Sequence, residues 1–434
     1  MAFKLGNMKD LLILCPTARE KRNLPHLAER IGVNLRFDDF GGDYFDDLLG
    51  ENPDLDTKPL DIAKLLDETV QRHYDDNLAG ITSGVGYPGM SATAVLTDRL
   101  DLPGPKPSPI LLCEHKYYCR VKQAAIVPTA TPEFYLIDPK ELKIIDEISM
   151  YPGFLKPVKS CMSKNAYQIK DKEELRKRAK ESLLPELFIL PFNDMVRLYT
   201  DWELNANYLL YEELLEGHQV SLEGFVYRGE VTVMGIIDAI MFPGTFSFKR
   251  FQYPSTLPAD VLLRMEQIAA TFMSGIGYDN AMFNFEMIYN PKKDSIHIIE
   301  INPKIASQFP DLFEKVDGSN TYEVMMRIAL GMEPGFLRGQ GKFRIAASCV
   351  LRTFDDKLVT QIPDQDNIKT VEQKFPESIV QVIATKGKKL SEQLQDSHSY
   401  RYGLINMGAD SEEELVQNFD TASKMLDYQL DPIH

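Results

Sequence analysis

The sequence is poor in several features that would define a protein class at once. Its five cysteines form no C-x-x-C pair and lack the spacing of a zinc knuckle, so neither a disulfide framework nor a structural zinc site is indicated, and buried thiols are expected. No apolar run approaches the length of a membrane span, and residues 11–15 are too few for the core of a signal peptide. These absences favour a cytoplasmic protein with no membrane partner.

Positive charge is also in deficit. The 434 residues include 48 Lys and Arg against 64 Asp and Glu, for a formal net charge of -16. This balance argues against a general binder of nucleic acid or anionic membranes, although an acidic enzyme can still hold a local basic pocket for phosphates. With 44% hydrophobic and 26% charged residues, the chain reads as an ordinary globular protein of two or three domains. We therefore expect small-molecule partners.

The clearest signal in the sequence is a β-hairpin over residues 282–303. Its arms are M-F-N-F-E-M-I-Y and I-H-I-I-E-I-N-P, and the turn between them is N-P-K-K-D-S. Both arms alternate with period two, so apolar and polar side chains fall on opposite faces. The apolar face is predicted to hold Phe283, Phe285, Met287, Ile299 and Ile301, and the other face Asn284, Glu286, Glu300 and Asn302. A register centred on the turn places Glu286 opposite Glu300 and Asn284 opposite Asn302, with paired Cβ atoms roughly 5 Å apart.

Two carboxylates that face each other repel. The same face should also carry Met282, Ile288 and Ile298, so we do not expect it to be fully exposed to solvent. An acid pair in such a place requires a proton or a cation. A half-exposed hairpin with a solvated polar face is the alternative. Two acids and two amides supply only oxygen ligands and amide donors, which suits a hard cation such as Mg²⁺. The hairpin is therefore interpreted as a magnesium platform.

The first hundred residues alternate strand and helix signals, which predicts a small parallel α/β domain. Within it, Gly84, Gly86 and Gly89 match G-x-G-x-x-G after a strand and before a helix. Pro88 lies inside the match and no acid follows at the expected offset, so a Gly-rich turn that lines a substrate cleft is favoured over a nicotinamide site. The prolines between residues 103 and 109 predict a linker or domain edge.

The order of four further motifs resembles the ATP-grasp superfamily. Lys116 precedes the break V-P-T-A-T-P, Lys156 ends a strand before Pro157, E-E-L-L-E-G follows, and the acid pair ends in E-I-N-P-K. The resemblance covers roughly residues 107–334 and implies an α/β (α+β) ATP-grasp fold with an N-terminal parallel α/β domain and a small C-terminal α+β subdomain. The implied domains are residues 1–106, 107–343 (lobes 107–205 and 206–343) and 344–434.

The resemblance also implies site residues. Lys116 and Lys156 match the lysines that hold ATP phosphates, for which point charges are suited, and solvated surface amines are the alternative. The nucleotide set is completed by the hinge residues Glu212, Glu213 and Leu215 and by Gln219. The implied magnesium ligands, with Mn²⁺ as an alternative metal, are Glu286, Glu300 and Asn302. The metal would bridge the β- and γ-phosphates during phosphoryl transfer.

Three departures from the superfamily pattern matter. The segment V-K-S-C-M-S-K-N-A after Lys156 has no glycine, so Ser160, Ser163, Lys159 or Lys164 are candidates for phosphate contact, with an ordinary turn as the alternative. Lys304 stands where arginine is usual, which keeps the charge but loses the bidentate fork, and Arg250 is nominated as a second catalytic cation with Tyr253 and Ser255 beside it. The A-S-Q-F-P continuation and the lack of a biotin-carrier segment disfavour carbon dioxide transfer.

The resemblance therefore implies the carboxylate-amine ligase branch, in which ATP phosphorylates a carboxylate and an amine displaces the phosphate to form an amide. An acid-thiol ligase that uses coenzyme A is the main alternative, an ATP-binding module without turnover is the alternative outside enzymes, and a nicotinamide dehydrogenase is more distant. Small-molecule carboxylate and amine substrates are expected, with no nucleic acid. The resemblance favours a homodimer.

Overall fold

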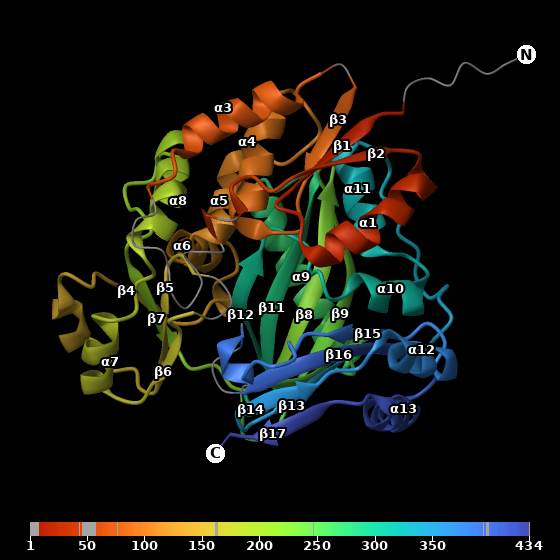
Figure 1. Cartoon of the computed structure of the whole chain (residues 1–434). Helices are drawn as coiled ribbons and strands as arrows, with labels where there is room; N and C mark the ends of the chain where they lie inside the picture. The colour runs from red at the N-terminus through yellow and green to blue at the C-terminus, as the bar shows by residue number, and fades with distance from the viewer. Residues whose placement is uncertain are drawn as a thin grey trace, which may run out of the picture.

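A computed structural model describes residues 8–433 apart from 43, 46–57, 76, 161–163, 246, 394 and 396–398. The N-terminal segment forms the predicted small parallel α/β unit, with strand order β2-β1-β3 (Figure 1). Its elements are β1 (Asp10–Leu14), α1 (Ala18–Ile31), β2 (Asn34–Asp38), α3 (Ile62–His73), β3 (Leu78–Thr82), a π-helical turn (Gly86–Met90) and α4 (Ser91–Arg99).

Helix α1 shows how the local sequence sets its ends. Thr17 caps it in a capping box with Glu20, and Gly32 ends it at a φ of 70°, a left-handed conformation that favours glycine. The prediction for the proline-rich segment was partly wrong. Pro107 and Pro109 lie in the first turn of α5 (Pro107–Glu114), because a helix start lacks the intrahelical hydrogen bonds that proline would remove.

The first lobe has a four-stranded sheet with order β4-β7-β5-β6. Helices α6 and α8 lie between this sheet and the N-terminal unit, and α7 lies on its outer side (Figure 1). The elements are α6 (Lys116–Ile126), β4 (Phe134–Ile137), β5 (Gly153–Pro157), β6 (Tyr167–Ile169), α7 (Lys172–Ala179), α8 (Glu186–Tyr199) and β7 (Leu209–Glu213).

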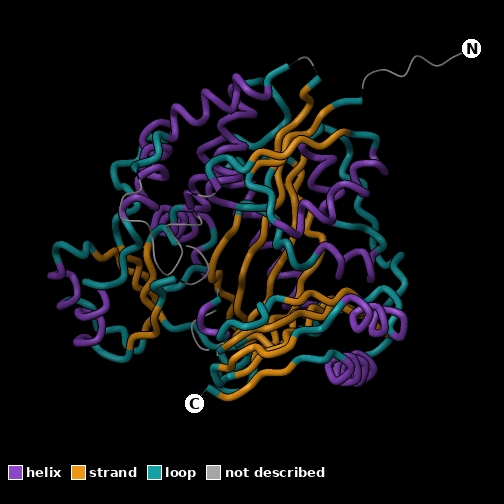
Figure 2. Tube along the Cα trace, in the orientation of Figure 1, coloured by secondary structure: helices purple, strands orange, loops and turns teal. Residues whose placement is uncertain are grey.

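An eight-stranded antiparallel sheet with order β12-β11-β8-β9-β10-β13-β16-β15 dominates the rest of the chain (Figure 2). Helix α9 packs on one face, and α10 and α11 pack on the other face together with α1. Its first elements are β8 (His218–Tyr227), β9 (Glu230–Met241), β10 (Phe248–Tyr253), α9 (Ala259–Gly275), β11 (Ala281–Asn290), β12 (Ser295–Asn302), α10 (Pro310–Asp317) and α11 (Thr321–Ala329).

The C-terminal segment extends this same sheet through β13, β16 and β15, so residues 344–434 are not a separate layer, and the domain boundaries stay a prediction. A short β14-β17 ribbon and two helices complete it. The elements are β13 (Ile345–Thr353), β14 (Lys357–Gln361), α12 (Gln365–Lys374), β15 (Ile379–Val382), β16 (Tyr400–Ala409), α13 (Glu412–Met425) and β17 (Gln429–Pro432). Short 3₁₀ turns cover Pro128–Ala130, Leu142–Asp146 and Leu390–Glu392.

The predictions from composition can be compared with the described residues. Cys113, Cys119 and Cys349 are buried free thiols, Cys15 is half-buried, and Cys161 lies outside the described residues. Among the described helices, none combines the length and the apolar character that crossing a membrane would require.

Candidate active site

The hairpin of β11 and β12 has the predicted register. Glu286 pairs with Glu300 and Asn284 with Asn302 across the two strands. We call the sheet face that carries these four residues the acid face. The neighbouring strand β8 continues it, because Ser221 pairs with Glu286 and Glu223 with Asn284.

One part of the hairpin prediction was wrong. The register shifts between Glu286 and Met287, so that Met287 pairs with Ile298 and the chain carries one extra residue at Ile299. Ile298 therefore packs into the core with Phe283 and Phe285, although strict alternation had placed it on the acid face. Ile299 is only half-buried, and its carbonyl oxygen accepts hydrogen bonds from Arg120 Nη2 at 2.7 Å and from Lys156 Nζ at 3.3 Å.

The electrostatics of the acid pair are asymmetric. Lys116 Nζ lies 2.7 Å from Glu300 Oε1. Burial would raise the pKa of Glu300, but the charges of Lys116 and then Lys156 lower it to about 2. For Glu286, burial first and the charge of Glu300 second raise the pKa to about 7. One carboxylate is thus ionised and the other needs a proton or a cation, so the predicted pair and one predicted lysine do come together.

The donor chemistry fits a magnesium ion that is shared with phosphates. Asn302 Nδ2 donates to Asn284 Oδ1 at 3.3 Å, which leaves Asn302 Oδ1 as an acceptor beside the two carboxylates. Within the described residues there is no group of three or more His, Cys, Asp and Glu side chains arranged for a metal ion. Two carboxylates and one amide oxygen would therefore need further oxygen ligands, which is the usual situation of Mg²⁺ bound together with a nucleotide.

Lys156 reaches the same cluster from β5. It is only 7% exposed, which excludes the solvated-amine alternative, and burial lowers its pKa. Its Nζ lies 2.7 Å from Glu212 Oε2, and Arg120 Nε lies 2.5 Å from Glu212 Oε1. Burial would raise the pKa of Glu212, but the two cations together hold it below its usual value. The Glu212 side chain therefore positions Lys156 and Arg120, a role that the hinge motif had not predicted.

The other nucleotide candidates lie at the joint between the two sheets. Residues 214–217, which include Leu215, connect β7 of the four-stranded sheet to β8 of the eight-stranded sheet. Glu213 ends β7, and its backbone N–H donates to the Glu133 carbonyl at 3.0 Å. Gln219 Nε2 donates to Glu286 Oε2 at 3.3 Å, so this side chain belongs to the acid face.

The segment after Lys156 is described except for residues 161–163, and its candidates for phosphate contact stay predictions. Lys159 is 2% exposed, forms an ion pair with Glu114, and lies 4.6 Å from the Tyr87 ring centre and 4.9 Å from that of Phe192. Ser160 Oγ donates to the Lys164 carbonyl at 2.7 Å. Ser163 lies outside the described residues.

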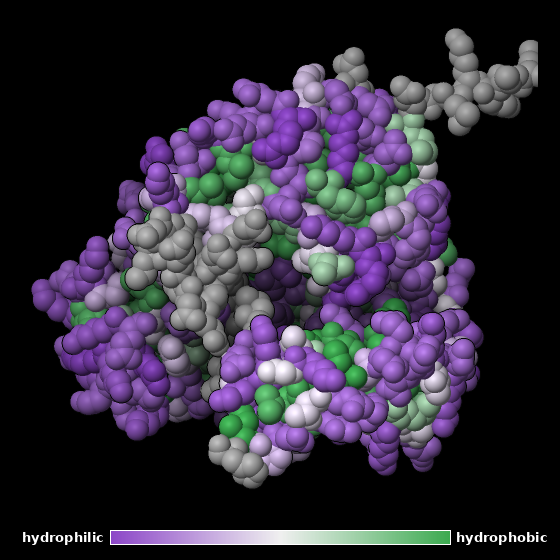
Figure 3. Space-filling model, viewed as in Figure 1, coloured by the Kyte–Doolittle hydropathy of each residue, from purple (hydrophilic) through white to green (hydrophobic). Residues whose placement is uncertain are grey.

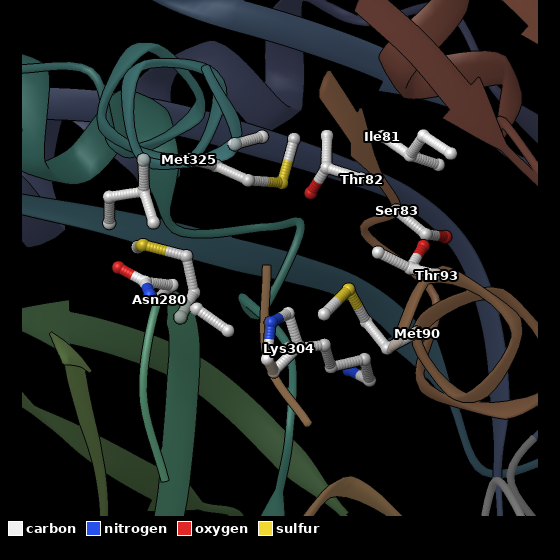
Figure 4. Close-up of a pocket in the computed structure, with 13 residues that line it drawn as sticks. Ile81, Thr82, Ser83, Met90, Thr93, Asn280, Lys304 and Met325 are labelled. Atoms are coloured by element: carbon white, nitrogen blue, oxygen red, sulfur yellow. The ribbon is translucent and has the colours of Figure 1, made fainter. Parts of the chain in front are cut away.

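Lys304 lies where the N-terminal unit meets the acid face. It helps to line a small pocket with residues from β3, α4 and α11 (Figure 4). A Cβ added to Gly86 would come within 2.2 Å of Glu114 Oε1 and 3.6 Å of Lys304 Cδ. The Gly-rich turn therefore has a glycine where it approaches the site closely, as expected for a turn that borders a cleft.

Arg250 is not brought to this cluster. It pairs with Cys349 across β10 and β13, and Cys349 packs beneath α13 on the face opposite to the acid face. Arg250 Nη2 instead donates to Glu412 at the start of α13. Tyr253 and Ser255 are also engaged elsewhere, with Asp317 and Asp238. The local motif did not show which side of β10 faces the acids.

Sequence reasoning missed Glu223, which is fully buried on the acid face. It accepts from Asn284 Nδ2 at 2.6 Å and from the Ala306 backbone N–H at 3.2 Å. Burial raises its pKa to about 8, although the nearby charge of Lys304 opposes this. Glu223 thus holds Asn284, and through it the amide of Asn302. The available signal in the sequence was the segment S-L-E, in which polar residues alternate with an apolar one as they do in the hairpin of the acid pair.

Replacing Glu223 by glutamine should change the pH dependence of stability. A carboxyl group whose folded pKa lies above its unfolded value stabilises the fold at low pH and loses this contribution as pH rises towards about 8. The difference in the free energy of unfolding between Glu223→Gln and wild type should therefore shift in favour of the variant as pH rises from 5 to 8.5. The expected shift is on the order of a few kcal/mol. Urea unfolding at both pH values measures this, with exposed Glu230→Gln as the control. An equal pH dependence in both variants would contradict it.

Residues 149–309 match the family model of the ATP-grasp domain. The fold is similar to an L-amino acid ligase from Bacillus licheniformis, with a TM-score of 0.75, 18% identity, and coverage of 98% of this chain and 99% of that one. Phosphoribosylglycinamide synthetase from Anaerococcus prevotii gives a TM-score of 0.64, 17% identity, and coverage of 98% and 100%.

A third similar structure is the biotin carboxylase domain dimer of 2-oxoglutarate carboxylase from Hydrogenobacter thermophilus, in complex with MgADP, ADP and bicarbonate. Its TM-score is 0.65, with 16% identity and coverage of 98% of this chain and 92% of that one. No curated protein sequence matches the chain. At these identities the structural likeness establishes the fold.

Proposed function

We propose, from the premise that this chain belongs to the ATP-grasp superfamily, that it is an ATP- and Mg²⁺-dependent ligase that converts a carboxylate into an acyl phosphate and joins it to an amine. The products would be an amide, ADP and phosphate. The observation that carries this proposal is the juxtaposition of the Glu286 and Glu300 pair with Lys116 and Lys156, contributed by separate parts of the chain.

Each residue then has a role that its environment supports. Lys116 and Lys156 would hold the phosphates, because both amines lie beside the acid pair. Glu286, Glu300 and Asn302 would hold Mg²⁺, which when bound neutralises charge on the β- and γ-phosphates. Our assignment of adenine recognition to the backbone at Glu213 and Leu215 rests on the position of residues 214–217 at the joint of the two sheets.

Lys304 is proposed to attract the reacting carboxylate and to stabilise charge on the acyl phosphate. Its amine comes from the strand end after Asn302, where it faces the buried Glu223 carboxyl and the Gly86 turn. The apolar part of the pocket lining, which includes Ile81, Met90 and Met325, would keep water from the acyl phosphate. The amine substrate would attack there.

The reaction products test the proposal. With a suitable acid and Mg·ATP, we expect ADP and not AMP, because the positive charges lie where the β- and γ-phosphates are proposed to bind. Hydroxylamine in place of the amine should capture the acyl phosphate as a hydroxamate. A phosphate-release screen against pooled amino acids and small carboxylic acids, followed by nucleotide chromatography, measures both. AMP with pyrophosphate would refute the mechanism, and a coenzyme A thioester without an amide would favour the acid-thiol ligase.

A further inference from the structure

A groove lies apart from the acid face and is not used by the proposed reaction. It is formed by the end of α6, the 3₁₀ turn Pro128–Ala130, one side of α9 and the turn of the β11–β12 hairpin. Its volume of about 450 Å³ is typical of sites that bind small molecules. All residues that line it belong to the described part of the chain. The groove is therefore a candidate for a second binding site.

The eight-stranded sheet separates this groove from the acid face. Ile296 lines the groove and packs into the core on the α9 side of the sheet, whereas Glu300 of the same strand points to the acid face. Lys116 begins α6 and Ile126 ends it, so about 15 Å of helix lies between the phosphate lysine and the groove. Figure 3 shows a different recess, between the N-terminal layer and the strands β15 and β16, and none of the described residues that line the groove comes from those elements. A molecule in the groove is thus remote from the reacting groups.

An ion pair forms part of the groove wall. Arg264 Nη2 lies 2.6 Å from Asp294 Oδ1, and Arg264 Nη1 donates to the Asp294 carbonyl at 3.4 Å. The Tyr289 hydroxyl donates to the same Oδ1 at 3.1 Å. The two charged side chains are 37% and 67% exposed. Both charges are therefore held in place and can still be reached by a ligand.

Two polar atoms of lining residues are buried without a partner. Arg264 Nε and Ser295 Oγ form no hydrogen bond with any described residue. Buried polar groups are usually paired, so both atoms point to an acceptor that the chain itself does not supply. The Arg264 side chain is long and its guanidinium is partly exposed, so a small rotation would bring Nε–H to a ligand. A carboxylate accepts several hydrogen bonds at once and suits both groups.

The rest of the groove includes apolar side chains. Val127 and Ile296 are 7% and 5% exposed, and Ile126 and Ile268 are half-buried against the same core. An apolar group of a ligand would remove the remaining surface of these residues from water, which favours binding. The two charges of the ion pair cancel, so the wall complements a molecule that carries one charge of each sign better than a simple anion or cation.

We propose that this groove is an accessory site for a small zwitterion with an apolar side chain, of the class of the α-amino acids. The carboxylate would accept from Arg264 and Ser295, and the ammonium group would donate to Asp294. The apolar side chain would lie against Ile268 and Ile296. The inference goes beyond the proposed function and does not depend on it, because no residue assigned to the reaction lines the groove.

Titration calorimetry with L-leucine tests the binding, and three analogues separate the contacts. Leucinamide lacks the carboxylate, 4-methylpentanoate lacks the ammonium group, and glycine lacks the side chain. Each analogue should bind the wild-type protein at least tenfold more weakly than leucine, because each loses one of the three kinds of contact. No binding of leucine at millimolar concentration, or equal binding of leucine and its analogues, would overturn the proposal.

Variants then assign the binding to the groove. Arg264→Gln and Asp294→Asn should each weaken leucine binding at least tenfold, and Gln267→Trp should block the groove with the ion pair intact. Lys293→Gln is the matched control, because Lys293 is exposed on the same turn and does not line the groove. The ion pair is largely exposed, so these variants should keep the wild-type melting temperature without leucine. Unchanged leucine affinity in Arg264→Gln and Asp294→Asn, or an equal loss in Lys293→Gln, would overturn the proposal.

One more variant separates the groove from the reacting centre, because an amino acid is also a carboxylate and an amine. Lys304→Ala changes the proposed reacting centre and leaves the groove intact, so it should bind leucine as wild type does. Loss of leucine binding in Lys304→Ala but not in Arg264→Gln would place leucine at the reacting centre and overturn the proposal. If no acid yields ADP or a hydroxamate while leucine still distinguishes Arg264→Gln from Lys293→Gln, the proposed function fails and the groove site stands.

Discussion

Replacing Glu300 by glutamine should abolish Mg²⁺-dependent ATP turnover and leave the fold intact. The loss should be at least roughly 10²-fold, the scale observed when one preorganised electrostatic contact is removed. The reason is the asymmetry of the acid pair: Lys116 lies 2.7 Å from Glu300 and keeps it ionised, so Glu300 supplies the fixed negative charge for the cation. A glutamine has the same shape without the charge. Phosphate release at varied Mg²⁺ concentration measures the effect.

Glu286→Gln provides the comparison, because both variants should lose turnover for the same reason while their effects on metal-free stability differ in sign. Glu300→Gln removes the partner of Lys116. Glu286→Gln removes the carboxyl group that burial and the charge of Glu300 disfavour, so it should be more stable than wild type above pH 7. Thermal unfolding in chelator checks this. Wild-type turnover in either variant would contradict the assignment of that residue as a magnesium ligand.

The hairpin shows how much of the site could be read from the sequence. Period-two alternation and a turn of Asn, Pro, Asp and Ser were sufficient to predict that Glu286 faces Glu300. The extra residue at Ile299 could not be predicted, because no glycine or proline marks the register shift. The Ile299 carbonyl accepts hydrogen bonds from Arg120 and Lys156, which belong to other parts of the chain.

The limits of sequence reasoning elsewhere have the same physical cause. Motifs predicted that Lys156 reaches phosphates, but they placed its partner Glu212 in the nucleotide hinge and did not show that its carboxylate contacts two cations. Which face of β10 is presented to the acids depends on its pairing with β9 and β13, so Arg250 was placed on the wrong side. The C-terminal strands that continue the sheet gave ordinary strand signals with no indication of their neighbours. Local sequence patterns predict individual helices and strands, whereas the pairing of strands decides which side chains meet in a site.

Replacing Glu212 by alanine should have the largest effect on stability. Glu212 is 4% exposed and lies between Arg120, which is 2% exposed, and Lys156, which is 7% exposed. Its carboxylate contacts both cations. Removal of the shared partner leaves two buried positive charges facing each other, and breaking a buried ion pair typically costs about 3–5 kcal/mol. We therefore expect a loss of about this size in the free energy of unfolding, measured by urea denaturation.

Glu213→Ala is the matched control, because the neighbouring glutamate ends the same strand and its carboxylate accepts from the Glu133 backbone N–H, without a buried cation beside it. It should cost less than about 1 kcal/mol, the usual size of a half-exposed contact. A loss below about 1 kcal/mol in Glu212→Ala would show that the two cations find water or other partners. Since Arg120 and Lys156 also hold the Ile299 carbonyl, the same variant should weaken ATP binding in calorimetry. Unchanged ATP affinity would mean that the ion cluster supports the fold without positioning the phosphate lysine.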